Sequence, residues 1–214
     1  MTTPSEKLAA SLAELKSLQD RDIVAIRAKY LTRTHRERLL KNGFIIEVMK
    51  GWYIPARPDE PSGESTAWYT CFWKFCAEYL NERFGTQWCL GPEHSLSLQT
   101  GNWTVPKQLI VRSPKAGNKP THLLFGTSVF DVRLEIPAPS DLEVLQGMRI
   151  MKLSVALLNC APSLFSTNPI EVRIALSMIS DSSDLLRRLL SGGHSVVAGR
   201  LTGALRNIGR IKLA

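Results

Sequence analysis

Basic side chains between residues 33 and 41 form the segment of the sequence best suited to bind a negatively charged ligand. Arginine donates two parallel hydrogen bonds to guanine, and the amides at a helix N-terminus attract phosphate. A helix that reads DNA places its N-terminal residues against base edges in the major groove. We therefore predict double-stranded DNA as a partner, contacted by Arg33, Thr34, His35, Arg36, Arg38 and Lys41. The alternative is a solvated basic face without a ligand, which is the usual role of a charged helix face.

Lys50 is a further candidate DNA contact. It lies in a predicted tight turn, Lys50-Gly51, between two short runs of β-forming residues. At the tip of such a hairpin, a lysine contacts the phosphate backbone, which positions a protein on a duplex without reading its sequence.

A second group of arginines lies near the end of the sequence, in residues 199–210, GRLTGALRNIGR. This segment is either a second basic face for nucleic acid or a helix whose apolar side docks on another protein. Its small residues, Gly199, Gly203 and Ala204, favour docking because they permit close approach of a helix. The predicted partner contacts are Arg200, Leu201, Leu205, Arg206 and Ile208. If the segment docks on another protein, Leu201, Leu205 and Ile208 should form an exposed apolar stripe in the isolated chain.

Motifs typical of catalysis are missing from the sequence, which contains no GxGxxG, GxxxxGK[ST], HExxH or GxSxG. His194 and Ser195, with Asp184 nearby in sequence, are predicted to form a turn between helices with Ser195 as the cap, since the members of a triad meet in space. Glu93 and His94 are predicted to be a capping pair at a helix start. We therefore expect no enzymatic activity, no cofactor and no metal site.

The four cysteines are irregularly spaced and lie among aromatic or aliphatic residues. Zinc sites use paired cysteines or clustered histidines, which this arrangement lacks. We predict buried thiols, with a disulfide or a nucleophile as the alternative.

The charge of the chain is concentrated at its two ends. The 214 residues carry a net charge of +8, with 44% hydrophobic and 21% charged residues, as in globular proteins. Residues 1–57 contain 11 Lys/Arg and 6 Asp/Glu, residues 58–180 contain 10 and 11, and residues 181–214 contain 6 and 2. This distribution indicates a negatively charged partner. The sequence also lacks a long apolar run and a secretory signal, so we expect a cytoplasmic protein that does not bind membranes.

Residues 1–57 are predicted to form a winged helix-turn-helix domain. Leucines at helical spacing predict a helix over residues 5–17, and Ile23, Val24 and Ile26 predict a short second helix. A third helix is expected to begin with a capping box of Thr34 and Glu37 and to end at Gly43. The runs 44–49 and 52–54 then predict a β-hairpin, which completes the element order of a winged helix.

Residues 58–214 are predicted to form a second domain, of α+β class, after a boundary in the Pro-rich run 57–63. An apolar helix is expected over 65–84; its aromatic residues lie round most of the circumference, which favours a core over an aromatic ligand site. Short strands are expected at 87–90, 109–112, 122–125 and 129–134, a hairpin at 144–150, and a helix at 92–98. From Leu153 the pattern is helical, with breaks near 162, 168–169, 180–181 and 192–193. The fold class is therefore a winged helix followed by a small mixed sheet with flanking and C-terminal helices.

The segment 31–53, LTRTHRERLLKNGFIIEVMKGWY, resembles the winged-helix head of the AbiEi-type antitoxins of type IV toxin-antitoxin systems. Those heads share a helix with Arg-x-x-Leu-x-x-x-Gly-Phe/Leu and a wing with Gly-x-Tyr, matched here by Arg36, Leu39, Gly43, Phe44, Gly51 and Tyr53. The resemblance implies an antitoxin-type transcriptional regulator that represses its own operon and engages a cognate toxin through its second domain, with homodimer formation as one expectation.

The motifs RTHRERLLKNGF, KGWYIP, GESTAWY and SGGHSVVAGR also resemble the N-terminal region of some longer bacterial Fic-domain proteins. The Fic catalytic loop, His-Pro-Phe-x-x-Gly-Asn-Gly-Arg, has no counterpart here, and the AMP-transferring activity is therefore not expected. This resemblance implies an alternative function, a regulatory interaction module for a Fic-domain protein.

Overall fold

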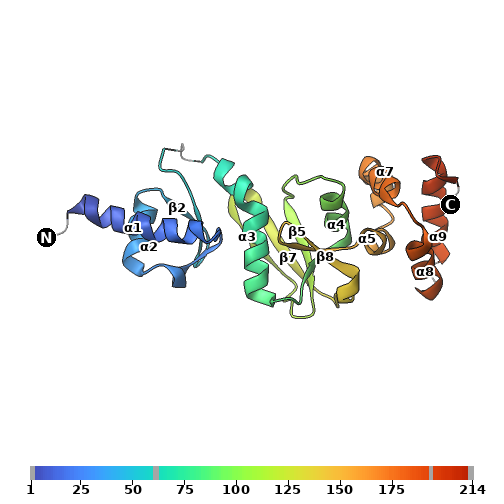
Figure 1. The fold of residues 1–214 in the computed structure, drawn as a ribbon, viewed down its shortest axis with the longest axis horizontal. Coiled ribbons are helices and arrows are strands. Elements are labelled where there is room, and N and C mark those ends of the chain that lie inside the picture. Colours follow the sequence, from blue (N-terminus) through green and yellow to red (C-terminus); the bar gives the residue numbers. More distant parts are fainter. Residues whose placement is uncertain (1–2, 60–62, 193–194, 212–214) are drawn as a thin grey trace.

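The computed structural model describes residues 3–59, 63–192 and 195–211, which form a mixed α/β fold. Helices contain 52% of the residues and strands contain 18%. Together with the small size of the sheets, this composition agrees with the predicted α+β class. The elements follow one another along the longest axis of the molecule, from α1 at one end to α9 at the other (Figure 1). None of the helices in these described ranges is long and apolar enough to cross a membrane.

The head, residues 3–59, contains two helices and a three-stranded antiparallel sheet of order β1-β3-β2. Its elements are α1 (Pro4–Asp20), β1 (Ile26–Arg27), the 3-10 turn η1 (Ala28–Tyr30), α2 (Arg33–Lys41), β2 (Ile45–Met49) and β3 (Trp52–Pro55). A core of buried side chains holds them together and comprises Leu15, Leu18, Ile26, Leu31, Leu39, Ile45 and Tyr53.

The second helix predicted at Ile23–Ile26 is wrong. Ile26 pairs with Tyr53 of β3 as part of β1, and only the 3-10 turn η1 separates this strand from α2. A run of four apolar residues is too short for its period to distinguish strand from helix, and pairing with β3 decides the outcome.

Helix α3 (Thr66–Phe84) confirms the helix predicted over 65–84 and occupies the centre of the molecule, beside the head (Figure 1). Trp68, Phe72, Phe75 and Leu80 are fully buried, whereas Tyr69 is exposed. One core contains these side chains together with Val48 and Ile54 of the head and with residues of the central sheet. Most of the aromatic residues are therefore buried because α3 has partners on more than one side. This core also crosses the predicted domain boundary.

The central sheet has the order β4-β5-β7-β6, with β5 and β7 parallel and the outer strands antiparallel to them. Its strands are β4 (Cys89–Leu90), β5 (Gln108–Ser113), β7 (Ser128–Arg133) and β6 (Lys119–His122). The strand predicted at 122–125 thus lies earlier in the chain, because Phe125 adopts a left-handed conformation (φ 50°) in the 3-10 turn η2 (Leu124–Gly126). Helix α4 (Pro92–Gln99) follows β4.

The predicted hairpin near 144–150 is confirmed as β8 (Leu142–Leu145) and β9 (Met148–Met151), after the 3-10 turn η3 (Pro139–Asp141). Among the described residues after β9, five helices follow: α5 (Leu153–Asn159), α6 (Leu164–Thr167), α7 (Pro169–Met178), α8 (Ser183–Gly192) and α9 (Ser195–Asn207). Their core includes Val155, Leu157, Val172, Leu176, Leu185, Leu201 and Leu205. The predicted break at 192–193 falls partly on residues 193–194, which lie outside the described residues.

Candidate nucleic-acid interface

Helix α2 begins two residues earlier than predicted. Thr32 is its N-cap and its side-chain oxygen accepts a hydrogen bond from the His35 amide at 3.3 Å. Thr34 is therefore not the cap, and Arg33 lies inside the helix. The predicted end is confirmed: Gly43 has φ 71°, and the amides of Gly43 and Phe44 donate to the carbonyls of Leu40 and Leu39. This Schellman arrangement turns the chain directly into β2.

The outer face of α2 carries Arg33, Thr34, Glu37 and Lys41, all exposed. Arg33 Nε donates to Glu37 Oε1 at 2.6 Å, one helical turn away. This hydrogen bond lowers the pKa of Glu37 and raises the pKa of Arg33. One of the predicted DNA contacts is therefore paired with a carboxylate on the same face, which the charge count of the segment alone did not reveal.

His35 and Arg38 face α1. His35 Nδ1 lies 2.9 Å from the Ser11 hydroxyl, and Arg38 Nη1 donates to that hydroxyl at 2.8 Å and to the Lys7 carbonyl at 2.7 Å. Ser11 is completely buried. These contacts give the two side chains a role in holding α1 against α2.

Arg36 connects α2 to η1 and β3. Its Nη1 donates to the Ala28 carbonyl at 3.1 Å, and its guanidinium lies 5.9 Å from the centre of the Tyr53 ring. The Ala28 amide donates to the Gly51 carbonyl at 2.9 Å. Ala28 therefore lies between Arg36 and the turn that contains Lys50, an exposed side chain.

A row of charged residues on α3 fixes the head to the rest of the molecule. Glu78 accepts hydrogen bonds from the amides of Val24 and Ala25 at 2.6 to 3.2 Å. One turn later, Glu82 accepts from Arg27 at 2.6 Å and Lys29 at 2.8 Å. One turn before Glu78, Lys74 pairs with Asp22 of the head. This row was not predicted from the sequence, although Lys74, Glu78 and Glu82 are spaced there by four residues.

Burial raises the pKa of Glu78, against the opposing effect of the two amides that donate to it. Aromatic contacts accompany these polar ones, because Trp52 of β3 packs edge-on against Phe75 and Tyr79 at 5.9 and 5.2 Å between ring centres. The orientation of the head on α3 is thus defined by hydrogen bonds and by shared core.

The predicted partner contacts on α9 divide into buried and exposed side chains. Leu201 and Leu205 are 1% and 3% exposed and pack in the core of the C-terminal helices, so the predicted exposed stripe is wrong for both. They are covered because α9 packs on α7 and α8 of the same chain. Arg200 lies over the Phe165 ring at 5.6 Å, Ile208 is half-buried, and Arg206 is exposed.

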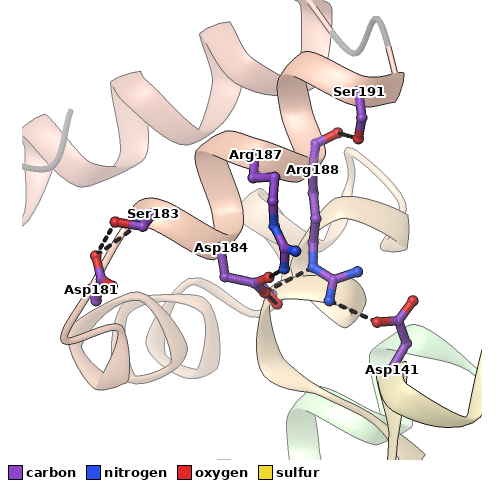
Figure 2. Close-up of polar contacts among 8 residues, drawn as sticks. Asp141, Asp181, Ser183, Asp184, Arg187, Arg188 and Ser191 are labelled. Atoms are coloured by element: carbon purple, nitrogen blue, oxygen red, sulfur yellow. Dashed lines mark hydrogen bonds and ion pairs between the residues drawn. The ribbon is translucent and has the colours of Figure 1, made fainter.

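A network of ion pairs anchors α8 to the elements beneath it (Figure 2). Arg188 donates to Asp184 at 2.8 Å and to Asp141 at 2.7 Å, and Arg187 also pairs with Asp184. Ser154 of α5 donates to Asp184 at 2.6 Å. The hydrogen bond from Arg188 is the main cause of the strongly lowered pKa of Asp184. Asp184 therefore serves as an anion in a structural network, which leaves it poorly suited to orient a catalytic histidine.

His194 lies outside the described residues, and α9 begins at Ser195. Glu93 and His94 do not form the predicted capping pair: no side chain caps α4, and Glu93 instead accepts a hydrogen bond from the Ala161 amide at 2.9 Å. Within the described ranges, no three His, Cys, Asp or Glu side chains gather as metal ligands would.

Three of the cysteines, Cys76, Cys89 and Cys160, are buried, and Cys71 is half-buried. Burial raises the pKa of Cys89 and of Cys160 to about 11. Their thiols are therefore protonated at neutral pH and are weak nucleophiles.

No protein-family model matches the sequence, and no curated protein is similar to it.

Proposed function

We propose that the chain is a DNA-binding transcriptional regulator of antitoxin type. In this proposal, residues 1–57 form a winged helix-turn-helix that binds operator DNA, and residues 58–214 engage a partner protein. The element order α1, β1, η1, α2, β2, β3 with a β1-β3-β2 sheet supports the winged-helix assignment, although a 3-10 turn replaces one helix.

The observation that carries this proposal is the link from Arg36 through Ala28 to the β2–β3 turn. This link supports the proposal because Arg36 of α2 and the turn that contains Lys50 both bind Ala28. Exposed Arg33 and Lys41 add positive charge along α2, and Thr34 adds a hydroxyl. We assign base or phosphate contact to Arg33, Thr34, Arg36 and Lys41 and phosphate contact to Lys50. His35 and Arg38 are assigned to positioning, since both bind α1.

The test is binding of the purified chain to a duplex from its own promoter and to an unrelated duplex, measured by fluorescence anisotropy between about 50 and 200 mM salt. We expect affinity to fall steeply with salt, by a log–log slope near −0.9 for each neutralised phosphate. Lys50→Ala should weaken binding to both duplexes equally and reduce the slope by about one phosphate, whereas Arg36→Ala should reduce the preference for the promoter.

Lys119→Ala is the matched control, because Lys119 is an exposed lysine in β6 of the central sheet. It removes the same charge outside the head and should leave affinity almost unchanged. Absence of binding at low salt, or equal losses for Lys50→Ala and Lys119→Ala, would contradict the proposal.

A second candidate function is a protein-interaction module, which is compatible with the first. It is favoured by an apolar groove of about 350 Å³ among α6, α7 and α9, lined in part by Arg200 and Ile208. Co-purification with a protein encoded by a neighbouring gene, lost on substitution in this groove, would support it.

A further inference from the structure

The groove among α6, α7 and α9 is apolar at its base. Val172 and Leu176, spaced by one turn of α7, form this base with Phe165 and Ile208, and the volume is about 350 Å³. Val172 and Leu176 are 4% and 1% exposed and belong to the core of the C-terminal helices, so they form the floor of the groove between α7 and α9. Side chains of a further helix can insert into such a groove between helices.

Two glycines of α9, Gly199 and Gly203, form the opposite wall. Both are helical, and a Cβ atom at either position would meet no atom within 4 Å. Glycine inside a helix is destabilising relative to alanine. Neither the backbone conformation nor packing within the described residues offsets this loss. Close approach by a segment of another protein would explain why glycine is present at both positions.

The charge of the groove identifies the chemistry of its occupant. Arg173 of α7 and Arg200 of α9 line it, and no Asp or Glu is among its lining residues. Glu171, the nearest carboxylate along α7, is directed elsewhere and accepts hydrogen bonds from Ser97 and Asn102. An occupant with negative side chains beside its apolar residues is therefore complementary to both the base and the edges of the groove.

We propose that this groove binds an amphipathic helix of a partner protein, with apolar residues at i, i+4 and i+7 and with Asp or Glu beside them. Grooves of this kind recognise helices through such spaced anchors. A second copy of this chain fits less well, because a two-fold contact would bring each copy's Arg173 and Arg200 towards those of the other. The inference deepens the partner-binding part of the proposed function and is independent of DNA binding.

The probe for this proposal is a displayed library of helical peptides of about 18 residues, or five turns, with a leucine ridge and with Glu or Lys at each flanking position. Selection against the full chain should enrich Glu at the flanks. Selected peptides are then measured against variants in solution. Gly203→Leu, which fills the groove, should lower affinity at least about tenfold. Ser191→Leu, which adds the same side chain at an exposed position of α8, should not.

Two further variants separate binding from folding. Gly203→Ala should raise the thermal unfolding midpoint, because alanine has the higher helix propensity, yet weaken peptide binding. Arg173→Glu should shift the preference from Glu-flanked to Lys-flanked peptides. Neither change should affect DNA binding by the head, so failure of this inference is distinguishable from failure of the DNA-binding proposal.

Three results would overturn the inference. The first is a selection that gives no binder or only Lys-flanked peptides. The second is binders that Gly203→Leu does not weaken, which would place them elsewhere on the molecule. The third is a concentration-dependent dimer, measured by sedimentation equilibrium, that Gly203→Leu dissociates, because the occupant would then be a second copy.

Discussion

Glu37 determines how much positive charge the outer face of α2 presents to a ligand. It is the carboxylate of this face and accepts a hydrogen bond from Arg33 at 2.6 Å, while Thr34 and Lys41 are exposed beside them. Exposed ion pairs contribute little to folding, so the pair has more effect on the local field than on stability. A phosphate close to Arg33 would compete with Glu37 for the same guanidinium.

Glu37→Gln is therefore expected to strengthen binding to any duplex by about two- to fivefold, the range that corresponds to an exposed ion pair. The measurement is anisotropy with promoter and unrelated duplexes at fixed salt. Glu143→Gln is the control, because Glu143 is an exposed carboxylate on β8 and its loss makes the same change in net charge. If both variants gain equally, net charge alone is responsible, and α2 is not the contact surface.

At the scale of elements, Glu78 is the partly buried carboxylate in the contact between the head and α3. Burial raises its pKa in the folded state relative to an exposed glutamate. A raised pKa means that the folded state binds the proton more tightly than the unfolded state does. The resulting stabilisation is fully present below the pKa of the unfolded chain and is lost as the pH rises through the pKa of the folded chain.

Glu78→Gln should therefore change the pH dependence of folding. The free energy of unfolding of the wild type, relative to that of this variant, is expected to increase as the pH falls from 7 towards the ordinary pKa of 4.5. Urea unfolding at a series of pH values measures it. Glu64→Gln, at an exposed carboxylate before α3, is the control and should show no such trend. A difference that is constant with pH would contradict the proposed role of burial.

The sequence predicts the elements of this fold better than it predicts which side chains are available to a ligand. The helix over 65–84 and the hairpin near 144–150 are correct because their patterns are local: a long apolar helix, and a turn in which Gln146 and Gly147 both have positive φ. Ile23–Ile26 is wrong because pairing with a distant strand decides its conformation.

The candidate site likewise combines features that the local sequence predicts with features that depend on residues distant in the chain. That α2 is basic follows from its composition, but the inward orientation of His35 and Arg38 depends on buried Ser11 in α1. Likewise, the apolar spacing of Leu201 and Leu205 is equally compatible with an internal and an external partner. Their burial is determined by the packing of α7 and α8, which no local pattern specifies.

At the scale of the whole molecule, the head and the central region share one core. Ile54 of β3 is completely buried in the core that also contains Trp68, Phe72 and Phe75 of α3. Removing apolar side chains from such a core lowers the stability of everything packed on it. The head is therefore expected to unfold together with the central region.

Ile54→Ala is expected to lower the free energy of unfolding by about 2 to 5 kcal/mol. Tryptophan fluorescence and far-ultraviolet circular dichroism should shift by the same amount in urea and should give one coincident transition. Ile170→Ala, at an exposed isoleucine of α7, is the control and should have little effect. Separate transitions in which only the head is destabilised would show that the head folds independently of α3.

The end-to-end order of the elements determines whether DNA and a partner protein can bind to the two proposed surfaces at the same time. Helix α2 and helix α9 lie near opposite ends of the longest axis, with α3 and the central sheet between them (Figure 1). A duplex on the first surface would not crowd a protein on the second, and a ternary assembly would need no rearrangement of the chain. If binding of the operator weakened binding of the partner, the effect would then have to pass through α3, where Glu78 and Glu82 accept hydrogen bonds from the head.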